Sequence, residues 1–326
     1  MKSPAHGRSF LLQKRQLGNS NLEVSLVGLG CNNFGARIDL DAARKVVDAA
    51  LDHGITLFDT ADIYGSKCGA SESVLGQALG GRRSQIVLAT KFGKPMDDAD
   101  SQPRGTRKYI AQAAEASLRR LGTDWIDLYQ MHEPDAHTPI EETLRALDDL
   151  VQNGKVRVIG CSNFSAMQVK EAQQTARDTG LTGFISCQDE YSLVERGIES
   201  DRLPVMKAEG LGLLPYFPLA SGLLTGKYRR NAELPEQSRF AHWKGLGERY
   251  MTEANWNIVD ALRTFAVRRD HSLLDLAISW LAAQAPVASV IAGATKPEQV
   301  VQNAAAAEWK LDADELAEID RLTTQS

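Results

Sequence analysis

The chain has 326 residues, of which 43% are hydrophobic and 24% charged, and its formal net charge is −5. These proportions are close to the average of globular proteins and exclude the fibrous, disordered and disulfide-scaffold classes. The slight acidic excess provides no broad basic field, so we expect neither a nucleic-acid partner nor binding to an anionic membrane surface.

The four cysteines lie far apart in the sequence and form no CxxC pair, which predicts free thiols and no zinc site. They are Cys31, Cys68, Cys161 and Cys187. The N-terminal apolar run Phe10–Leu12 is too short for a signal peptide, and no segment is apolar over the length of a membrane span. We therefore expect a cytoplasmic protein without a membrane partner.

The first elements expected are two extended stretches between Lys14 and Gly30, joined by a turn at Gly18–Asn21. They predict an N-terminal β-hairpin. Short β-prone runs then alternate with amphipathic helical segments, such as the stripe Ile140, Leu144, Leu147 and Val151. The eight runs are Leu26–Gly30, Ile55–Asp59, Ile86–Lys91, Trp125–His132, Val156–Asn163, Phe184–Gln188, Leu211–Tyr216 and Ala288–Gly293.

This alternation fits a doubly wound sheet or a closed barrel. A dinucleotide-binding doubly wound sheet should carry GxGxxG in its first turn, but the turn at residues 28–33 reads GLGCNN. Eight units without an interdomain linker predict instead a (β/α)8 TIM barrel at about residues 26–310. We expect a single domain over residues 1–326, in which a further helix follows the barrel.

Three capping-box patterns predict helix starts, and one long segment lacks an obvious element. The patterns are Ser165-x-x-Gln168, Thr295-x-x-Glu298 and Asp312-x-x-Glu315. The stretch Ser221–Tyr250 contains no clear strand or helix, and its length is typical of a functional loop. We interpret it as a lid or clamp after the seventh strand.

Functional groups of such barrels gather at the carboxyl ends of the strands, where this sequence places Asp59, Lys91 and His132, with Tyr64 just beyond. Each has an ordinary structural explanation when taken singly. Asp59 can cap a helix, Lys91 can pair with it, His132 can be a core histidine and Tyr64 a surface aromatic. Their convergence on one face favours an acid–base site.

A tyrosine hydroxyl has a pKa near 10 and needs a cation beside it to act near neutral pH. Lys91 supplies that charge, and Asp59 holds Lys91 protonated and oriented. His132 would donate a hydrogen bond to a substrate carbonyl. These residues can protonate an alkoxide as it forms, but they supply no electrons, so we expect a hydride-donating cofactor.

The remaining strand ends suit that cofactor. Ser162, Asn163 and Gln188 can hydrogen-bond a carboxamide, and Tyr216 can stack on a nicotinamide ring. The turn Gly293–Pro297 opens a helix whose N-terminus suits a phosphate, at the usual phosphate site of these barrels. Additional positive charge is available from Lys227, Arg239 and Lys296.

The sequence resembles the aldo-keto reductase family from about Leu17 to Leu322. Six motifs carry the resemblance, in order: Phe58-Asp59-Thr60-Ala61-Asp62-x-Tyr64-Gly65, Ala89-Thr90-Lys91, Leu128-Tyr129-Gln130-Met131-His132, Ile159-Gly160-x-Ser162-Asn163-Phe164, Pro218-Leu219-Ala220-x-Gly222-Leu223-Leu224-x-Gly226-Lys227 and Gly293-Ala294-Thr295. The long loop before Arg239 resembles the branches of bacterial aldehyde reductases and potassium-channel β subunits.

The resemblance implies that Tyr64 is the general acid–base, that Lys91 and Asp59 assist it and that His132 orients the carbonyl. It also implies an NADP(H) site. The expected cofactor contacts are Gly30, Cys31, Asn32, Ser162, Asn163, Gln188, Tyr216, Phe217, Pro218, Leu219, Ser221, Gly222, Leu223, Lys227, Ser238, Arg239, Gly293, Thr295, Lys296, Gln299 and Asn303.

Three positions depart from the family pattern: Phe217 replaces a frequent serine, Ala292 a frequent proline, and Gln302 a glutamate that often meets the adenine. Lys296 is the expected partner of a 2′-phosphate, which favours NADP(H), although NAD(H) stays open. The main expectation is NADP-dependent reduction of aldehydes or ketones. The alternatives are an NAD(P)-dependent sugar or alcohol dehydrogenase and a cofactor-binding regulatory subunit. The sequence leaves the carbonyl or sugar substrate and the oligomeric state open.

Overall fold

A computed structural model of the chain describes residues 12–96, 102–235 and 238–324. The N-terminal apolar run Phe10–Leu12, apart from Leu12, lies outside these ranges. Eight strands form one parallel sheet in the order β10-β3-β4-β5-β6-β7-β8-β9. They are β3 (Val27–Gly30), β4 (Leu57–Asp59), β5 (Val87–Phe92), β6 (Ile126–Met131), β7 (Val156–Ser162), β8 (Ser186–Gln188), β9 (Gly212–Leu213) and β10 (Val290–Gly293).

The sheet closes on itself through the segment that precedes β10. The Leu213 amide donates to the Pro286 carbonyl at 3.0 Å, and the Ala288 amide donates to the Leu213 carbonyl at 2.9 Å. All eight predicted runs therefore contain a strand of the ring, and the (β/α)8 barrel is confirmed.

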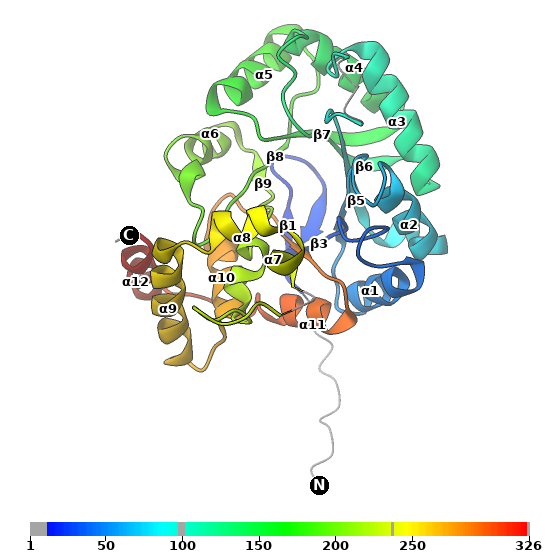
Figure 1. Cartoon of the computed structure of the whole chain (residues 1–326). Helices are drawn as coiled ribbons and strands as arrows, with labels where there is room; N and C mark the ends of the chain where they lie inside the picture. The colour runs from blue at the N-terminus through cyan, green and yellow to red at the C-terminus, as the bar shows by residue number, and fades with distance from the viewer. Residues whose placement is uncertain (1–11, 97–101, 236–237, 325–326) are drawn as a thin grey trace.

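The helices surround this ring (Figure 1). The crossover helices are α1 (Leu40–Asp52), α2 (Ala70–Leu79), α3 (Arg107–Leu121), α4 (Ile140–Gln152), α5 (Ala166–Thr179), α6 (Arg202–Glu209) and α10 (Leu273–Ala283), and α11 (Pro297–Ala305) follows the last strand. The stripe predicted on α4 buries Leu144 and Leu147 against the strands. Beyond the barrel, α12 (Ala313–Thr324) packs on α9 (Glu253–Val267), which confirms the additional helix.

The predicted hairpin, β1 (Lys14–Gln16) and β2 (Glu23–Ser25), lies across one end of the ring (Figure 1). Its Leu17 and Val24 pack with Leu57 and other side chains of the barrel interior. Gly18 has φ +55°, and a Cβ there would lie 2.1 Å from the Ile185 carbonyl oxygen. Only glycine allows this turn to approach the strands, so the hairpin covers the end opposite to the functional strand ends.

Two of the three predicted capping boxes are present. In the pair Ser165 and Gln168, each side chain accepts a hydrogen bond from the backbone amide of the other residue. The pair Asp312 and Glu315 is bonded in the same way. The prediction at Thr295 is wrong, because α11 begins at Pro297 with Lys296 as N-cap and no side-chain cap.

The segment Ser221–Tyr250 also differs from expectation, because it contains short helices. They are most of η3 (Ala220–Thr225), α7 (Arg239–His242) and α8 (Lys244–Tyr250). Two further short turns of 3-10 helix are η1 (Gly80–Gln85) and η2 (Gly197–Glu199).

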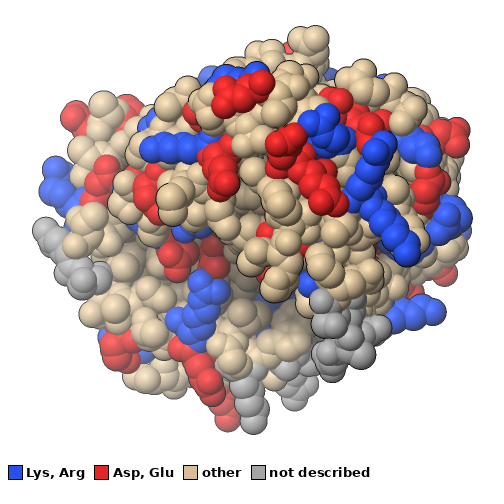
Figure 2. All heavy atoms as spheres, turned by 90° about the horizontal axis from the view of Figure 1, so that it is seen from above, with Lys and Arg blue, Asp and Glu red and all other residues tan. Residues whose placement is uncertain are grey.

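The surface carries charges of both signs, which are interspersed over the face in Figure 2. None of the helices in the described part of the chain is long and apolar enough to cross a membrane.

Candidate active site

A cavity of about 880 Å³ opens at the carboxyl ends of the strands. Asp59, Tyr64 and His132 line it, whereas Lys91 lies behind them and is fully buried. Every predicted cofactor contact lines the same cavity except Leu223, which is buried in the core beneath it. The structure thus brings together nearly all residues that the sequence singled out.

Asp59 and Lys91 form a buried ion pair, with 2.7 Å between Lys91 Nζ and Asp59 Oδ2. Lys91 Nζ also donates to the Thr60 carbonyl at 2.8 Å. Burial alone would lower the pKa of Lys91, but Asp59 and Tyr64 together raise it above its ordinary value. Lys91 therefore stays an ammonium at neutral pH.

The Tyr64 hydroxyl is hydrogen-bonded to this ammonium, and Lys91 Nζ lies 5.0 Å from the Tyr64 ring centroid. Burial raises the pKa of Tyr64, and the lowering by Lys91 does not cancel that effect. Lys91 lowers the pKa of Tyr64, as the sequence predicts, but burial raises this pKa by more. In this structure Tyr64 is consequently a neutral phenol that holds its proton at the cavity wall.

His132 stands edge-on to Tyr64, with ring centroids 5.7 Å apart. Burial, followed by the charges of Lys91 and Lys94, lowers the pKa of His132 to about 2. The imidazole is therefore neutral at physiological pH and carries one N–H. Its Nδ1 is buried and has no hydrogen-bond partner among the described residues.

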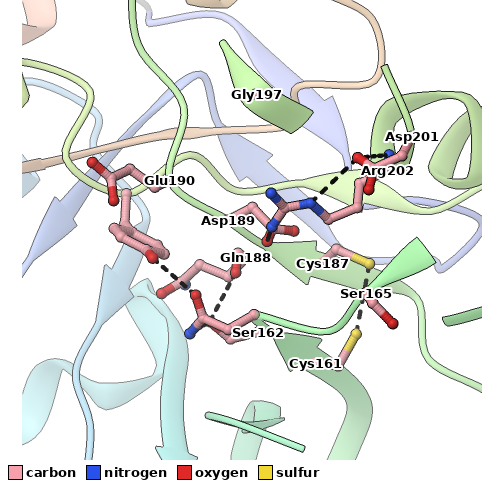
Figure 3. Close-up of polar contacts among 12 residues, drawn as sticks. Cys161, Ser162, Ser165, Cys187, Gln188, Asp189, Glu190, Gly197, Asp201 and Arg202 are labelled. Carbon is pink, nitrogen blue, oxygen red and sulfur yellow. Dashed lines mark hydrogen bonds and ion pairs between the residues drawn. The ribbon is translucent and has the colours of Figure 1, made fainter. Parts of the chain in front are cut away.

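A polar network continues from these groups to the predicted nicotinamide contacts. The Tyr216 hydroxyl donates to Asn163 Oδ1 at 2.8 Å, and Asn163 Nδ2 donates to the His132 carbonyl at 3.0 Å. Ser162 Oγ donates to the Gln188 carbonyl at 2.7 Å (Figure 3).

The Gln188 side chain, predicted to contact the cofactor, is hydrogen-bonded to Asp59. Its Nε2 donates to Asp59 Oδ1 at 2.9 Å. Gln130 Nε2 approaches the same oxygen at 3.4 Å. In the closed ring, β4 and β8 are four strands apart, so the Gln188–Asp59 bond crosses the mouth of the barrel. The strands β4, β6 and β8 alternate around the ring, as in the side-chain layers of TIM barrels.

The four cysteines are free thiols. Cys161 and Cys187 directly precede Ser162 and Gln188 on neighbouring strands, and their sulfur atoms are 3.6 Å apart (Figure 3). Burial is the main cause that raises the pKa of Cys161 well above its ordinary value. These thiols act here as small buried residues behind the site.

The segment Phe217–Gly222 has an unusual backbone. Its φ angles are +50° at Phe217, +45° at Ala220, +55° at Ser221 and +105° at Gly222. Such conformations are costly for residues other than glycine, and they can form concavities that bind anions. The Ala220 and Gly222 amides already donate to the Phe217 and Leu219 carbonyls, at 2.8 and 2.7 Å. A Cβ on Gly222 would lie 3.0 Å from Lys227 Nζ, so a cation adjoins the concavity.

The Ser221 hydroxyl supports the binding of a phosphate at this segment. Ser221 lines the cavity, and its buried Oγ has no hydrogen-bond partner among the described residues. A bound phosphate oxygen would satisfy it.

The other end of the cavity also suits an anionic, aromatic ligand. The Arg239 guanidinium carbon lies 5.7 Å from the Phe217 ring centroid and 5.5 Å from that of Trp243. Lys296 lies at the N-terminus of α11, whose first turn has no side-chain cap. The Thr295 amide, however, donates to Gln299 Oε1 at 2.8 Å, so a ligand would compete for it.

Several lining residues were missed by the sequence argument. They are Asn33, Arg37, Ile38, Ile63, Lys94, Glu190, Thr225, Pro235, Arg249, Leu274, Ile291 and Ala294. Two polar members continue predicted strand ends: Lys94 follows Lys91 by three residues, and Glu190 follows Gln188 by two. Extending each strand end by three residues would have found both. Arg249 reaches Glu190 from α8 at 2.8 Å, a contact without a local sequence signal.

A second buried carboxyl lies behind the site. The Asp62 amide donates to the Lys91 carbonyl at 3.0 Å, but Asp62 Oδ1 is buried without a partner among the described residues. Burial and then the nearby Glu72 raise the pKa of Asp62 to about 8. The buried Tyr129 hydroxyl is likewise unpartnered within those residues. Asp62 is therefore mainly neutral at pH 7.

Comparisons with known proteins agree with this architecture. Residues 26–324 match the Aldo/keto reductase family. The chain is 39% identical over 302 residues to a probable voltage-gated potassium channel subunit beta of Oryza sativa subsp. japonica, with 90% of each chain covered. It is 34% identical over 321 residues to the L-glyceraldehyde 3-phosphate reductase of Escherichia coli O157:H7, covering 95% of this chain and 92% of the relative.

A third relative is an uncharacterized oxidoreductase of Bacillus subtilis (strain 168), 37% identical over 308 residues, with 91% and 92% covered. The relatives fall in the branch that the sequence suggested. The extent of the family match and the identity to relatives of similar length show that this chain belongs to the aldo/keto reductase family.

Proposed function

We propose that the protein is an NADP(H)-dependent oxidoreductase that reduces aldehydes or ketones to alcohols, with Tyr64 as the general acid–base. The observation that carries the proposal is the Tyr64 hydroxyl, hydrogen-bonded to the buried Lys91–Asp59 pair at the wall of the large cavity. The relative named L-glyceraldehyde 3-phosphate reductase supports carbonyl chemistry.

Each of the four residues has a role in that chemistry. NADPH, when bound, supplies the hydride for the carbonyl carbon. Tyr64 donates its phenolic proton to the carbonyl oxygen, and Lys91 stabilises the phenolate that remains. Asp59 keeps Lys91 charged and oriented. Neutral His132 donates one hydrogen bond to the carbonyl oxygen and fixes its direction.

The rest of the cavity suits the cofactor. Ser162, Asn163 and Tyr216 would meet the nicotinamide end, and the concavity at Ser221–Gly222 would hold the pyrophosphate. Lys296 would bind the 2′-phosphate, which favours NADP(H) over NAD(H). We also propose that the whole chain is one domain, because a single closed ring organises the elements from the hairpin to α12.

The decisive variant is Tyr64→Phe, which removes one hydroxyl. We expect NADPH-dependent turnover of a test aldehyde to fall by about 100- to 10,000-fold, as for loss of a general acid. NADPH binding, followed by fluorescence titration, should persist. Activity within a few-fold of the parent protein would exclude Tyr64 as the acid.

The channel-subunit relative specifically favours a second candidate, a cofactor-binding regulatory subunit. Bound NADPH without turnover of aldehydes, ketones or sugars in the parent protein would support it. A panel of these compounds, assayed in both directions with NADP(H) and NAD(H), would also separate reduction from NAD(P)-dependent oxidation of a sugar or alcohol.

A further inference from the structure

Lys94 lies beside the reacting groups but has no part in the mechanism above. It follows β5 by two residues and lines the same cavity as Tyr64 and His132. The backbone before it runs alongside β6, because a Cβ on Gly93 would lie 3.7 Å from the His132 nitrogen. Lys94 is thus anchored next to the proposed carbonyl site.

The charge of Lys94 affects His132. It contributes, after burial and Lys91, to the lowered pKa of His132. Lys94 Nζ is 2.5 Å from Glu133 Oε1, with side-chain exposures of 29% and 44%. An ion pair so exposed is held weakly, and a stronger anion can replace the carboxylate.

The described part of the cavity lining has an excess of basic residues, although the chain has a net negative charge. Among the described residues, the lining includes six Lys or Arg residues, namely Arg37, Lys94, Lys227, Arg239, Arg249 and Lys296, and two acidic residues, Asp59 and Glu190. Asp59 is paired with Lys91, and Glu190 with Arg249. Lys227, Arg239 and Lys296 adjoin the part assigned to the cofactor.

We propose that the site takes short aldehydes that carry a phosphate group, and that Lys94 is the specificity residue that binds this phosphate. This inference rests on the proposed function. Lysine acts as a compact point charge for phosphate, and a phosphate dianion outcompetes the single charge of Glu133. Glu133 then serves as a placeholder that keeps Lys94 oriented until substrate arrives.

The test compares kcat/KM, with NADPH, for glyceraldehyde 3-phosphate and glyceraldehyde. We expect the parent protein to prefer the phosphorylated aldehyde by at least about tenfold, the factor for one hydrogen bond to a charged group. Lys94→Met should lower this ratio about tenfold, Lys94→Arg should largely retain it, and Glu133→Gln should raise it.

Lys170→Met is the matched control. It removes the same charge from an exposed position on α5, outside the cavity, and should leave the ratio at the parent value. A Lys94→Met ratio equal to that of the parent would overturn the proposal, as would equal losses in Lys94→Met and Glu133→Gln. A Lys94-dependent preference for succinic semialdehyde, without one for the phosphate, would overturn the choice of phosphate. Failure to reduce either glyceraldehyde would instead count against the proposed function.

Discussion

The two halves of the cavity are built differently. Around Lys91, charged groups are buried, paired and carried by strand ends, so the rigid barrel fixes their positions. Around Ser221, the backbone itself shapes the site: several residues have left-handed conformations, and the Ser221 hydroxyl has no partner in the part of the chain that the structure describes. The Lys91–Asp59 ion pair of the first half forms without a ligand. In the second half the buried Ser221 hydroxyl, which lines the cavity, has no partner among the described residues, so a ligand can satisfy it. We therefore expect changes in the first half to affect stability and chemistry together, and changes in the second to affect binding.

Lys91→Met should have the largest effect. It leaves the buried Asp59 carboxylate without its cation, which destabilises proteins by about 3–5 kcal/mol. It also removes the ammonium beside Tyr64, so the variant should lose both stability and turnover. Urea unfolding and kcat/KM measured on the same preparation test both effects.

The double variant Asp59→Asn/Lys91→Met separates the two effects. It removes both charges at nearly constant volume, so we expect most of the lost stability to return while activity stays low. Recovery of activity along with stability would contradict the role of Lys91 at the Tyr64 hydroxyl.

Asp62→Asn should have an intermediate effect that depends on pH. The pKa of Asp62 is about 8 when folded and near 3.9 when unfolded, so between these values only the folded state binds the proton. Asp62 therefore costs stability as pH rises from about 4 to about 8. Asp62→Asn should match the parent near pH 4 and exceed it by on the order of 2–5 kcal/mol at pH 8. Unfolding free energies that run parallel over this range would show that Asp62 is ionised in the fold.

Lys296→Ala should have the smallest effect and should spare stability. Loss of one charge at the proposed 2′-phosphate site should weaken NADPH binding by about tenfold and NADH binding much less. Fluorescence titration with both cofactors measures the difference, and Lys310→Ala, outside the cavity, is the control. Equal weakening of both cofactors would remove Lys296 from that site.

The barrel could be predicted because eight β-prone runs alternate with amphipathic helical segments and the first turn lacks the third glycine of GxGxxG. The site could be predicted because parallel strands bring their polar carboxyl ends to one rim. Asp59, Lys91 and His132 were found in this way. Short helices such as α7, with 4 residues, escaped because one turn is too short for periodicity to appear. The cap at Thr295 was wrong because Gln299 occupies its amide and Lys296 takes the N-cap position. Contacts such as Arg249–Glu190 depend on how a long connection returns to the rim, which has no local pattern.

The hydrogen bond between Gln188 and Asp59 links β8 and β4, which lie on opposite sides of the ring. Because of this bond, Asp59 cannot be moved to suit a new substrate without also disturbing Gln188 on the opposite strand. New specificities would arise more readily at rim side chains such as Lys94 and Arg249, which line the cavity but take no part in the Gln188–Asp59 bond. Directed evolution of the rim, with Gln188 held fixed, should then change substrate choice while preserving the bond-making step.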